Sequence, residues 1–285
     1  MQAGLGSDVA TPEAVRSTAP TRTVDRPERR RRFIDPTDLA MKALALLLLA
    51  AVWQGISLLY PPTFLPGPAL VLGRVAELIW TGEFAAQAVP TVLRVLVGFF
   101  LAIALGSAVG VAMGLRRRLE SFFEAYILVG LTIPGLAWAV LALMWFGIGE
   151  VAPVFSIVAV TAPMLAVNMW QGTKAIDREL IEMQRAFRAS RRSILVDVVV
   201  PQLLPYLFAA SRFGFGLGWK VVVLSEMFGL SSGIGYQINR AFSLYSMQNV
   251  LAWTIGFTLV MGFFEYGFLR PLERHFLRWR PALAG

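Results

Sequence analysis

The chain alternates long apolar segments with short basic ones, and the length of the apolar segments limits the folds open to it. Across residues 39–60 the only charged side chain is Lys42. An α-helix rises about 1.5 Å per residue, so a segment of this length can cross the roughly 30 Å hydrocarbon core of a bilayer. Mean hydropathy is +0.63 and only 15% of residues are charged, which leaves more apolar surface than a soluble domain can cover. The sequence therefore predicts an all-α integral membrane protein.

Five further membrane-spanning helices are expected after the first. The second span starts near residue 89, and the other four cover about residues 122–146, 152–171, 204–230 and 250–269. Pro134 and Gly135 interrupt the third span, and such breaks are tolerated where neighbouring helices satisfy the freed backbone groups. A short amphipathic helix is expected at residues 69–80, at the outer interface, and a polar loop at residues 231–248.

The distribution of Lys and Arg predicts the orientation of these spans. The proposed inside segments, which include both termini, hold 20 Lys and Arg residues, whereas the outside loops hold only Arg74 and Arg240. Basic residues accumulate in cytoplasmic loops, so we expect both termini in the cytoplasm. Residues 1–38 lack an apolar periodicity and are expected to be a disordered basic tail, with residues 39–285 as the transmembrane domain. The arginines at 29–32 orient the first span or bind anionic membrane lipid.

Several kinds of chemistry are excluded by composition. The chain has no Cys and a single His, His275, so thiolate and histidine metal sites are not expected. It lacks a G-x-x-x-x-G-K-[ST] phosphate loop, and no catalytic residue is predicted. The net charge is +8, and the basic residues that produce it lie between the spans, which argues against nucleic acid as a partner. Small residues recur at every fourth position of the second span, which predicts close helix packing; they are Gly98, Ala102, Gly106, Gly110 and Gly114.

Residues 174–206 form the longest strongly charged insertion between two spans. Its first half predicts an amphipathic helix, whose apolar positions are Ile176, Leu180, Met183 and Phe187. Ser190 precedes a second short helix, and Pro201 and Pro205 mark the start of the next span. On charge alone, an ordinary basic loop is an equally good interpretation.

This insertion resembles the cytoplasmic loop of permease subunits in ABC importers. The family pattern is roughly E-A-A, three residues, G, about nine residues, an apolar residue, L and P. Glu182 takes its first position, Arg188 stands where glycine is usual, and Val200 with Pro201 closes it. The strings LRVLVGF, LMWFGIG, VVPQLLPYLF, LSEMFG and SSGIGY are similar to the nitrate/sulfonate/taurine branch, and the resemblance covers about residues 60–280.

The resemblance implies a type I ABC importer permease fold with six transmembrane helices, in a bacterial inner membrane. It also implies a homodimer of permease subunits, two ATP-binding subunits that hold Mg-ATP, and a periplasmic or lipid-anchored solute-binding protein. The substrate would be a small anion such as nitrate, a sulfonate, taurine or an aromatic acid. The alternatives are an ion-coupled secondary transporter and a membrane enzyme.

Two sets of residues are candidates for function. Those expected to contact the ATPase within the coupling loop, residues 174–200, or just after it are Glu179, Leu180, Glu182, Met183, Arg185, Ala186, Phe187, Arg188, Ser190 and Pro201. An arginine at 188 means that the loop turns elsewhere or that the side chain contacts an acidic patch on the ATPase. Polar groups inside spans are costly and mark candidate pathway residues, here Trp138, Asn168, Gln171, Lys220 and Glu226. The structural alternative is that Glu226 snorkels outward and that a neighbouring helix or a partner subunit satisfies Lys220.

Overall fold

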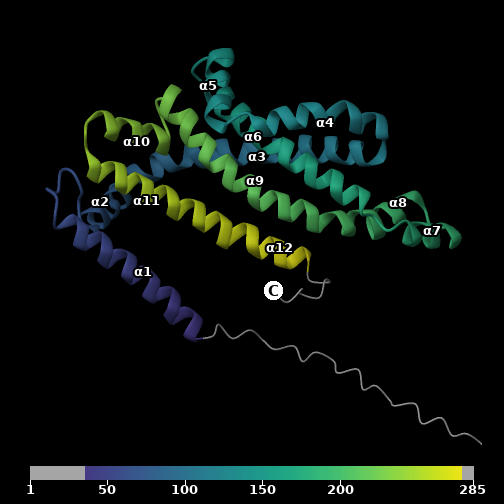
Figure 1. Ribbon diagram of the computed structural model, residues 1–285, viewed down its shortest axis with the longest axis horizontal. Coiled ribbons are helices and arrows are strands. Elements are labelled where there is room, and N and C mark those ends of the chain that lie inside the picture. Colours follow the sequence, from purple (N-terminus) through teal and green to yellow (C-terminus); the bar gives the residue numbers. More distant parts are fainter. Residues whose placement is uncertain (1–35, 278–285) are drawn as a thin grey trace, which may run out of the picture. The chain divides into compact units, whose positions relative to one another are not determined.

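The computed structural model describes residues 36–277, and every regular element in this range is a helix (Figure 1). Nearly all of the predicted disordered tail lies outside the described residues. Residues 1–48 and 49–285 form two units, and α1 (Pro36–Ser57) crosses the boundary between them.

The remaining elements belong to residues 49–285. In order they are α2 (Pro68–Trp80), α3 (Glu83–Leu115), α4 (Arg117–Thr132), α5 (Gly135–Phe146), α6 (Val151–Lys174), α7 (Arg178–Ala186), α8 (Arg191–Ile194), the π-helical turn η1 (Leu195–Val199), α9 (Val200–Gly229), α10 (Ile234–Ser243), α11 (Met247–Phe264), the π-helical turn η2 (Glu265–Leu269) and α12 (Arg270–Phe276). Within residues 36–277, five helices are long and apolar enough to cross a membrane, and the number is six if α4 and α5 count as one bent span.

The third predicted span is not a continuous helix. Its two halves, α4 and α5, meet at an angle of 101°. Pro134 disfavours the α conformation in the residue before it, and Ile133 is accordingly extended, with φ −69° and ψ 124°. Gly135 then lets α5 begin directly against α9, where a Cβ atom would lie 2.8 Å from a methyl group of Val221. The interruption predicted at Pro134 and Gly135 is therefore confirmed, and it takes the form of a sharp bend between two helices.

The predicted close packing of the second span is confirmed by the contact between α3 and α6. A Cβ atom added at Gly98 would lie 2.8 Å from Ile157, and one at Gly106 would lie 2.7 Å from the backbone oxygen of Ala162. Gly110 lies against the backbone of Ala166 in the same way. The absence of side chains along this stripe brings the two helix backbones together.

Neither Pro201 nor Pro205 breaks the helix that leads into the fifth span. The chain is helical without interruption from Arg191 to Gly229. A proline ring clashes with the carbonyl group four residues earlier, which for Pro201 belongs to Asp197. Asp197 lies within η1, whose wider π-helical turn accommodates the proline. The predicted punctuation at these prolines is therefore wrong, and the coupling loop joins α9 as one helix.

The segment predicted as a polar loop at 231–248 contains a helix, α10. Its residue Ile234 is buried in a cluster with Val71 and Leu78 of α2 and Trp253 of α11. The predicted amphipathic helix at 69–80 is confirmed as α2, and its apolar face packs on this cluster. As a result α2, α10 and α11 form a compact group at the end of α9 opposite to α7 and α8 (Figure 1).

Candidate functional site

The α7–α8 loop presents an uncovered apolar face. Asp177 caps α7, since its carboxylate accepts a hydrogen bond from the backbone N–H of Glu179 at 2.9 Å. Leu180, Met183 and Phe187 are exposed, and the Phe187 side chain is 81% exposed. Within residues 36–277 nothing covers this face, which is a suitable surface for another protein.

Arg188 forms the turn that ends α7. Its φ is +55°, in the left-handed region that favours glycine. The backbone N–H of Ala189 donates to the carbonyl of Gln184 at 3.0 Å, and that of Arg188 donates to Arg185 at 2.9 Å. These two bonds make a Schellman motif, whose left-handed position is Arg188. The alternative that the loop turns elsewhere is therefore wrong.

The predicted coupling residues lie on three consecutive elements. Ser190 caps α8, because its hydroxyl accepts from the backbone N–H of Ser193 at 3.1 Å. Pro201 is half-buried in the first turn of α9. The others are exposed in α7 or its final turn: Glu179, Leu180, Glu182, Met183, Arg185, Ala186, Phe187 and Arg188.

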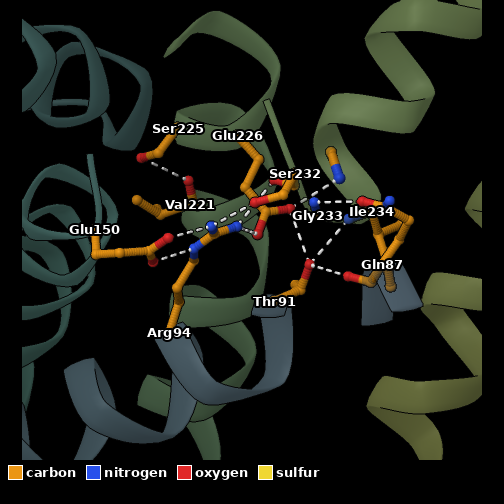
Figure 2. A network of polar contacts seen from close by, with 11 residues as sticks. Gln87, Thr91, Arg94, Glu150, Val221, Ser225, Glu226, Ser232, Gly233 and Ile234 are labelled. Atoms are coloured by element: carbon orange, nitrogen blue, oxygen red, sulfur yellow. Dashed lines mark hydrogen bonds and ion pairs between the residues drawn. The ribbon is translucent and has the colours of Figure 1, made fainter. Parts of the chain in front are cut away.

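A buried ion pair lies at the other end of α9 (Figure 2). The carboxylate of Glu226 is 0% exposed and accepts from Arg94 Nη1 at 2.8 Å, from Thr91 Oγ1 at 3.0 Å and from the backbone N–H of Gly235 at 2.9 Å. A buried charge is tolerated when it is both paired and hydrogen-bonded, as here. Glu226 therefore joins α9 to α3 and to the start of α10.

Arg94 uses all five of its N–H donors. Its Nε and Nη2 atoms each donate to the Glu150 carboxylate at 2.6 Å. The carbonyl and hydroxyl oxygens of Ser232 accept from Nη1 at 2.9 Å and from Nη2 at 2.8 Å. Together with the bond to Glu226 these contacts satisfy the guanidinium completely. One side chain of α3 thus holds the α5–α6 turn and the α9–α10 turn in place.

The α9–α10 turn fits around this pair only because two of its residues are glycines. Gly233 has φ +110°, and a Cβ atom there would overlap the Glu226 carboxylate. At Gly235 an added Cβ would lie 2.8 Å from Glu226 Cβ. The backbone N–H of Gly233 donates to Gln87 at 2.9 Å and that of Ile234 donates to Thr91 at 2.9 Å. The string SSGIGY is therefore the turn that closes over Glu226.

Sequence reasoning missed the role of Arg94 in this network. The string LRVLVGF, which contains Arg94, and the string SSGIGY indicate only the resemblance to the family. Arg94 lies near the outer end predicted for its span, and Glu226 near the outer end predicted for another. Two opposite charges at the same depth in two spans were the signal that could have paired them.

Glu150 is the solvent-exposed member of the network. Its side chain is 70% exposed, in contrast to the buried Arg94 and Glu226. The hydrogen bonds and positive charge of Arg94 hold the pKa of Glu150 below its usual range, although partial burial acts in the opposite direction. Ion pairs with such exposure are weak, so the Glu150 contact is the one that can open most easily.

The predicted pathway residues are not gathered into one cluster. Trp138 Nε1 donates to the carbonyl of Gly130 at 3.5 Å across the α4–α5 bend, and Asn168 donates to its own helix at Met164, at 2.9 Å. Gln171 is exposed, and so is Lys220, which makes no hydrogen bond or ion pair with any residue in 36–277. Within residues 36–277 no hydrogen bond or ion pair joins two of the five candidates, and their pathway role stays a prediction.

Comparison with known proteins decides the family. Residues 98–274, more than half of the chain, match the binding-protein-dependent transport system inner membrane component family. The chain belongs to this family. The permease is 31% identical over 248 residues to the putative aliphatic sulfonates transport permease protein SsuC of Bacillus subtilis (strain 168), which covers 86% of this chain and 90% of the relative. It is 29% identical over 249 residues to the taurine transport system permease protein TauC of Escherichia coli (strain K12), covering 85% and 89%.

The fold of the permease agrees with that of a solved ABC transporter chain. A chain of the inward-facing MetNI methionine ABC transporter has a TM-score of 0.59 and 19% sequence identity, covering 70% of the permease and 98% of that chain. The predicted type I ABC importer permease fold is confirmed, and so is the resemblance to the sulfonate and taurine branch. The alternatives of an ion-coupled secondary transporter and a membrane enzyme do not agree with this family.

Proposed function

We propose that this permease forms the translocation pathway of an importer and that a separate ATPase subunit, which holds Mg-ATP, docks on α7. The observation that carries the proposal is the uncovered apolar face of the α7–α8 loop with Phe187 at its tip. The segment also carries charges of both signs, which set the register of a partner in a groove. The full assembly is a homodimer of permeases with two ATPase subunits and a solute-binding protein.

The continuity of α8, η1 and α9 gives the docking surface a mechanical link to the membrane. A movement imposed on α7 and α8 is transmitted along one helix of 39 residues, from Arg191 to Gly229. That helix carries Lys220 in its interior and ends at the Glu226 network. Closure of the ATPase dimer would thereby tilt α9 and change which side of the membrane the pathway faces.

Truncation of the exposed aromatic side chain tests the docking surface. In Phe187→Ala, copurification of the ATPase subunit should fall at least about tenfold, since aromatic anchors dominate such interfaces. The matched control is Trp80→Ala, which removes a 92% exposed ring at the opposite end and should leave ATPase recruitment unchanged. Normal recruitment and normal uptake by Phe187→Ala would exclude α7 as the docking helix.

Charge reversal tests the same surface independently of its apolar face. Arg185→Glu should weaken recruitment or uncouple ATP hydrolysis from uptake, because Arg185 is exposed beside Met183 and Phe187. Within residues 36–277 the Arg185 side chain makes no hydrogen bond or ion pair, so the yield of folded permease should not change. Normal stoichiometry together with substrate-stimulated hydrolysis would contradict the proposal.

We further propose that Lys220 lines the pathway and that the substrate is a small anion. An ammonium group facing lipid at mid-span costs about 3 kcal/mol, so the exposed Lys220 favours a polar cavity. The names of the relatives SsuC and TauC refer to aliphatic sulfonates and taurine, which agrees with a positively charged pathway. Glu226 does not contact the substrate; its bonds to α3 and α10 hold the end of α9 in place.

Uptake measured beside complex yield separates a pathway role from an assembly role. Lys220→Met should reduce uptake of a sulfonate at least about tenfold while complex yield stays normal, and Lys220→Arg should restore most of it. Arg212→Met is the control because Arg212 is paired with Glu273 of α12. Loss of yield in proportion to uptake in Lys220→Met would indicate packing instead.

We propose that the α7–α8 loop faces the cytoplasm, because basic residues are concentrated at that end. The native chain has no Cys, which makes single-cysteine labelling unambiguous. An impermeant thiol reagent applied to intact cells should label Trp80→Cys and leave Ser190→Cys unlabelled. The reverse pattern would invert the orientation.

A further inference from the structure

A polar cavity of about 170 Å³ lies among α2, the start of α3, α10 and α11. It is separate from the Arg94 network and from the α7–α8 loop. The side chains that matter here are Arg74, Glu83, Gln237, Arg240 and Trp253. Its volume suits a molecule of a few heavy atoms, well below the size of typical drug sites.

The two arginines of the cavity differ in their partners. Arg74 is fixed, since Nε donates to Asn249 Oδ1 at 2.7 Å and Nη1 pairs with Glu77 at 2.8 Å. Arg240 is exposed and makes no ion pair or side-chain hydrogen bond within residues 36–277. The guanidinium of Arg240 therefore brings five N–H donors to the cavity without a partner from the described chain.

Gln237 supplies a second group whose bonding capacity the chain does not use. It is only 7% exposed, and its side-chain amide has no hydrogen bond to any described residue. A buried amide normally has a partner. Gln237 and Arg240 are three residues apart on α10, so they lie on the same face of that helix, and both line the cavity.

The remaining walls define the chemistry of a ligand. Arg74 is paired with Glu77 and lies 3.9 Å from Glu83, so the positive charge that the cavity offers to a ligand is that of Arg240. The buried ring of Trp253 and the methyl group of Ala241 form an apolar side. A planar or tetrahedral oxyanion matches a guanidinium fork, and a short hydrocarbon body matches the indole.

We propose that this cavity binds a small organic oxyanion, a sulfonate or a carboxylate, through Arg240 and Gln237. The head group accepts hydrogen bonds from both side chains, and the carbon body lies against Trp253. This ligand class agrees with the anionic substrate of the proposed function. That the cavity is a site for the transported substrate, at the end opposite to α7, rests on the proposed function. Binding itself does not depend on any ATPase subunit.

The test uses purified full-length permease in zwitterionic nanodiscs, without partner subunits. The probe is 3,3,3-trifluoropropane-1-sulfonate, followed by ¹⁹F NMR, and the uncharged comparison is 4,4,4-trifluorobutan-1-ol. Saturable binding of the sulfonate, displaced by ethanesulfonate and not seen for the alcohol, is expected. Absence of saturable binding in the folded protein would overturn the proposal.

Variants locate the site. Arg240→Gln should weaken binding of the probe at least about tenfold, Arg240→Lys less, and Gln237→Leu about threefold to tenfold. The control is Arg191→Gln, an exposed arginine on α8 that should change nothing. Thermal unfolding checks that each variant is folded. Wild-type affinity in Arg240→Gln and Gln237→Leu would place the anion elsewhere and overturn the assignment.

A membrane phosphate is the other source of the same head-group chemistry. Repeating the titration in nanodiscs that contain phosphatidylglycerol distinguishes the two sources. Unchanged affinity supports a free organic anion as the ligand. Competition between phosphatidylglycerol and the probe that disappears in Arg240→Gln supports the same oxyanion site, with a lipid head group as its occupant. ATPase recruitment through Phe187 is unaffected by either result, so this proposal and the proposed function can fail separately.

Discussion

Arg188 holds a backbone conformation that costs an L-residue about 1–2 kcal/mol. Glycine adopts it without that strain, although it loses more entropy on folding. We therefore expect Arg188→Gly to stabilise the end of α7 by up to about 1 kcal/mol, seen as slower hydrogen exchange of the amides of residues 186–190. The control is Arg185→Gly within α7, which should speed exchange. Faster exchange in Arg188→Gly would mean that the arginine side chain stabilises the turn.

The Arg94–Glu226 pair should behave as a buried ion pair in a double-mutant cycle. Arg94→Met leaves Glu226 as a buried charge without a partner and should lower the free energy of unfolding by about 3–5 kcal/mol. Glu226→Met leaves Arg94 paired with Glu150 and should cost less. The double variant should be less destabilised than the sum of the two, because no unpaired charge remains. Equilibrium unfolding in mixed micelles measures all four proteins. Simple additivity would show that the two charges do not interact.

Acid should weaken the outer edge of the same network through Glu150. Its pKa is lowered in the folded state, so its contribution to stability is present above the usual carboxyl range, about pH 4.3, and is lost as pH falls through the lowered value. The unfolding temperature of wild type should exceed that of Glu150→Gln at neutral pH, and the difference should vanish in acid. The control is Glu124→Gln, which removes an exposed carboxylate that has no ion pair within residues 36–277.

At the scale of elements, the α3–α6 contact depends on the absence of side chains. Gly110→Ala should destabilise the permease by about 1–3 kcal/mol, because the new methyl group meets the backbone of Ala166. Gly73→Ala is the matched control, since Gly73 lies in α2 with nothing within 4 Å of its Cβ position. That change should stabilise α2 by about 0.5–1 kcal/mol. Equal effects of the two substitutions on the unfolding temperature would contradict this account.

The spans could be predicted because each is long, apolar and bounded by charge. The stripe from Gly98 to Gly114 correctly predicted a close helix contact, because small residues at every fourth position lie on one face of a helix and let another helix approach it. The 101° bend at Pro134 was not predictable, because proline within a span either kinks or ends a helix, and the outcome depends on what packs against Gly135. The passage of α9 through Pro201 depends in the same way on the π-helical turn before it.

At the scale of the whole molecule, the shared surface of residues 178–190 was predictable from a local pattern, and the Arg94 network was not. Residues 178–190 lie within one short segment, so their order along the chain already gives their shared surface. The contacts of Arg94 join it to residues 56 and 132 positions away in the sequence. Helix periodicity says which way Glu226 points but not which helix it meets, so only the tertiary structure could place its partner.

The close approach of α6 to α3 extends to α9, where Gly214 and Gly218 pack against Thr161 and Ile157. Three backbones locked at such short range cannot slide past one another without severe overlap, because packed interiors are not continuously deformable. In the proposed dimer, the switch between inward-facing and outward-facing states is then expected to move each copy as a whole. Each copy would tilt as a rigid body about an axis perpendicular to the shared twofold axis, so that the gap between the two copies opens on one side of the membrane as it closes on the other.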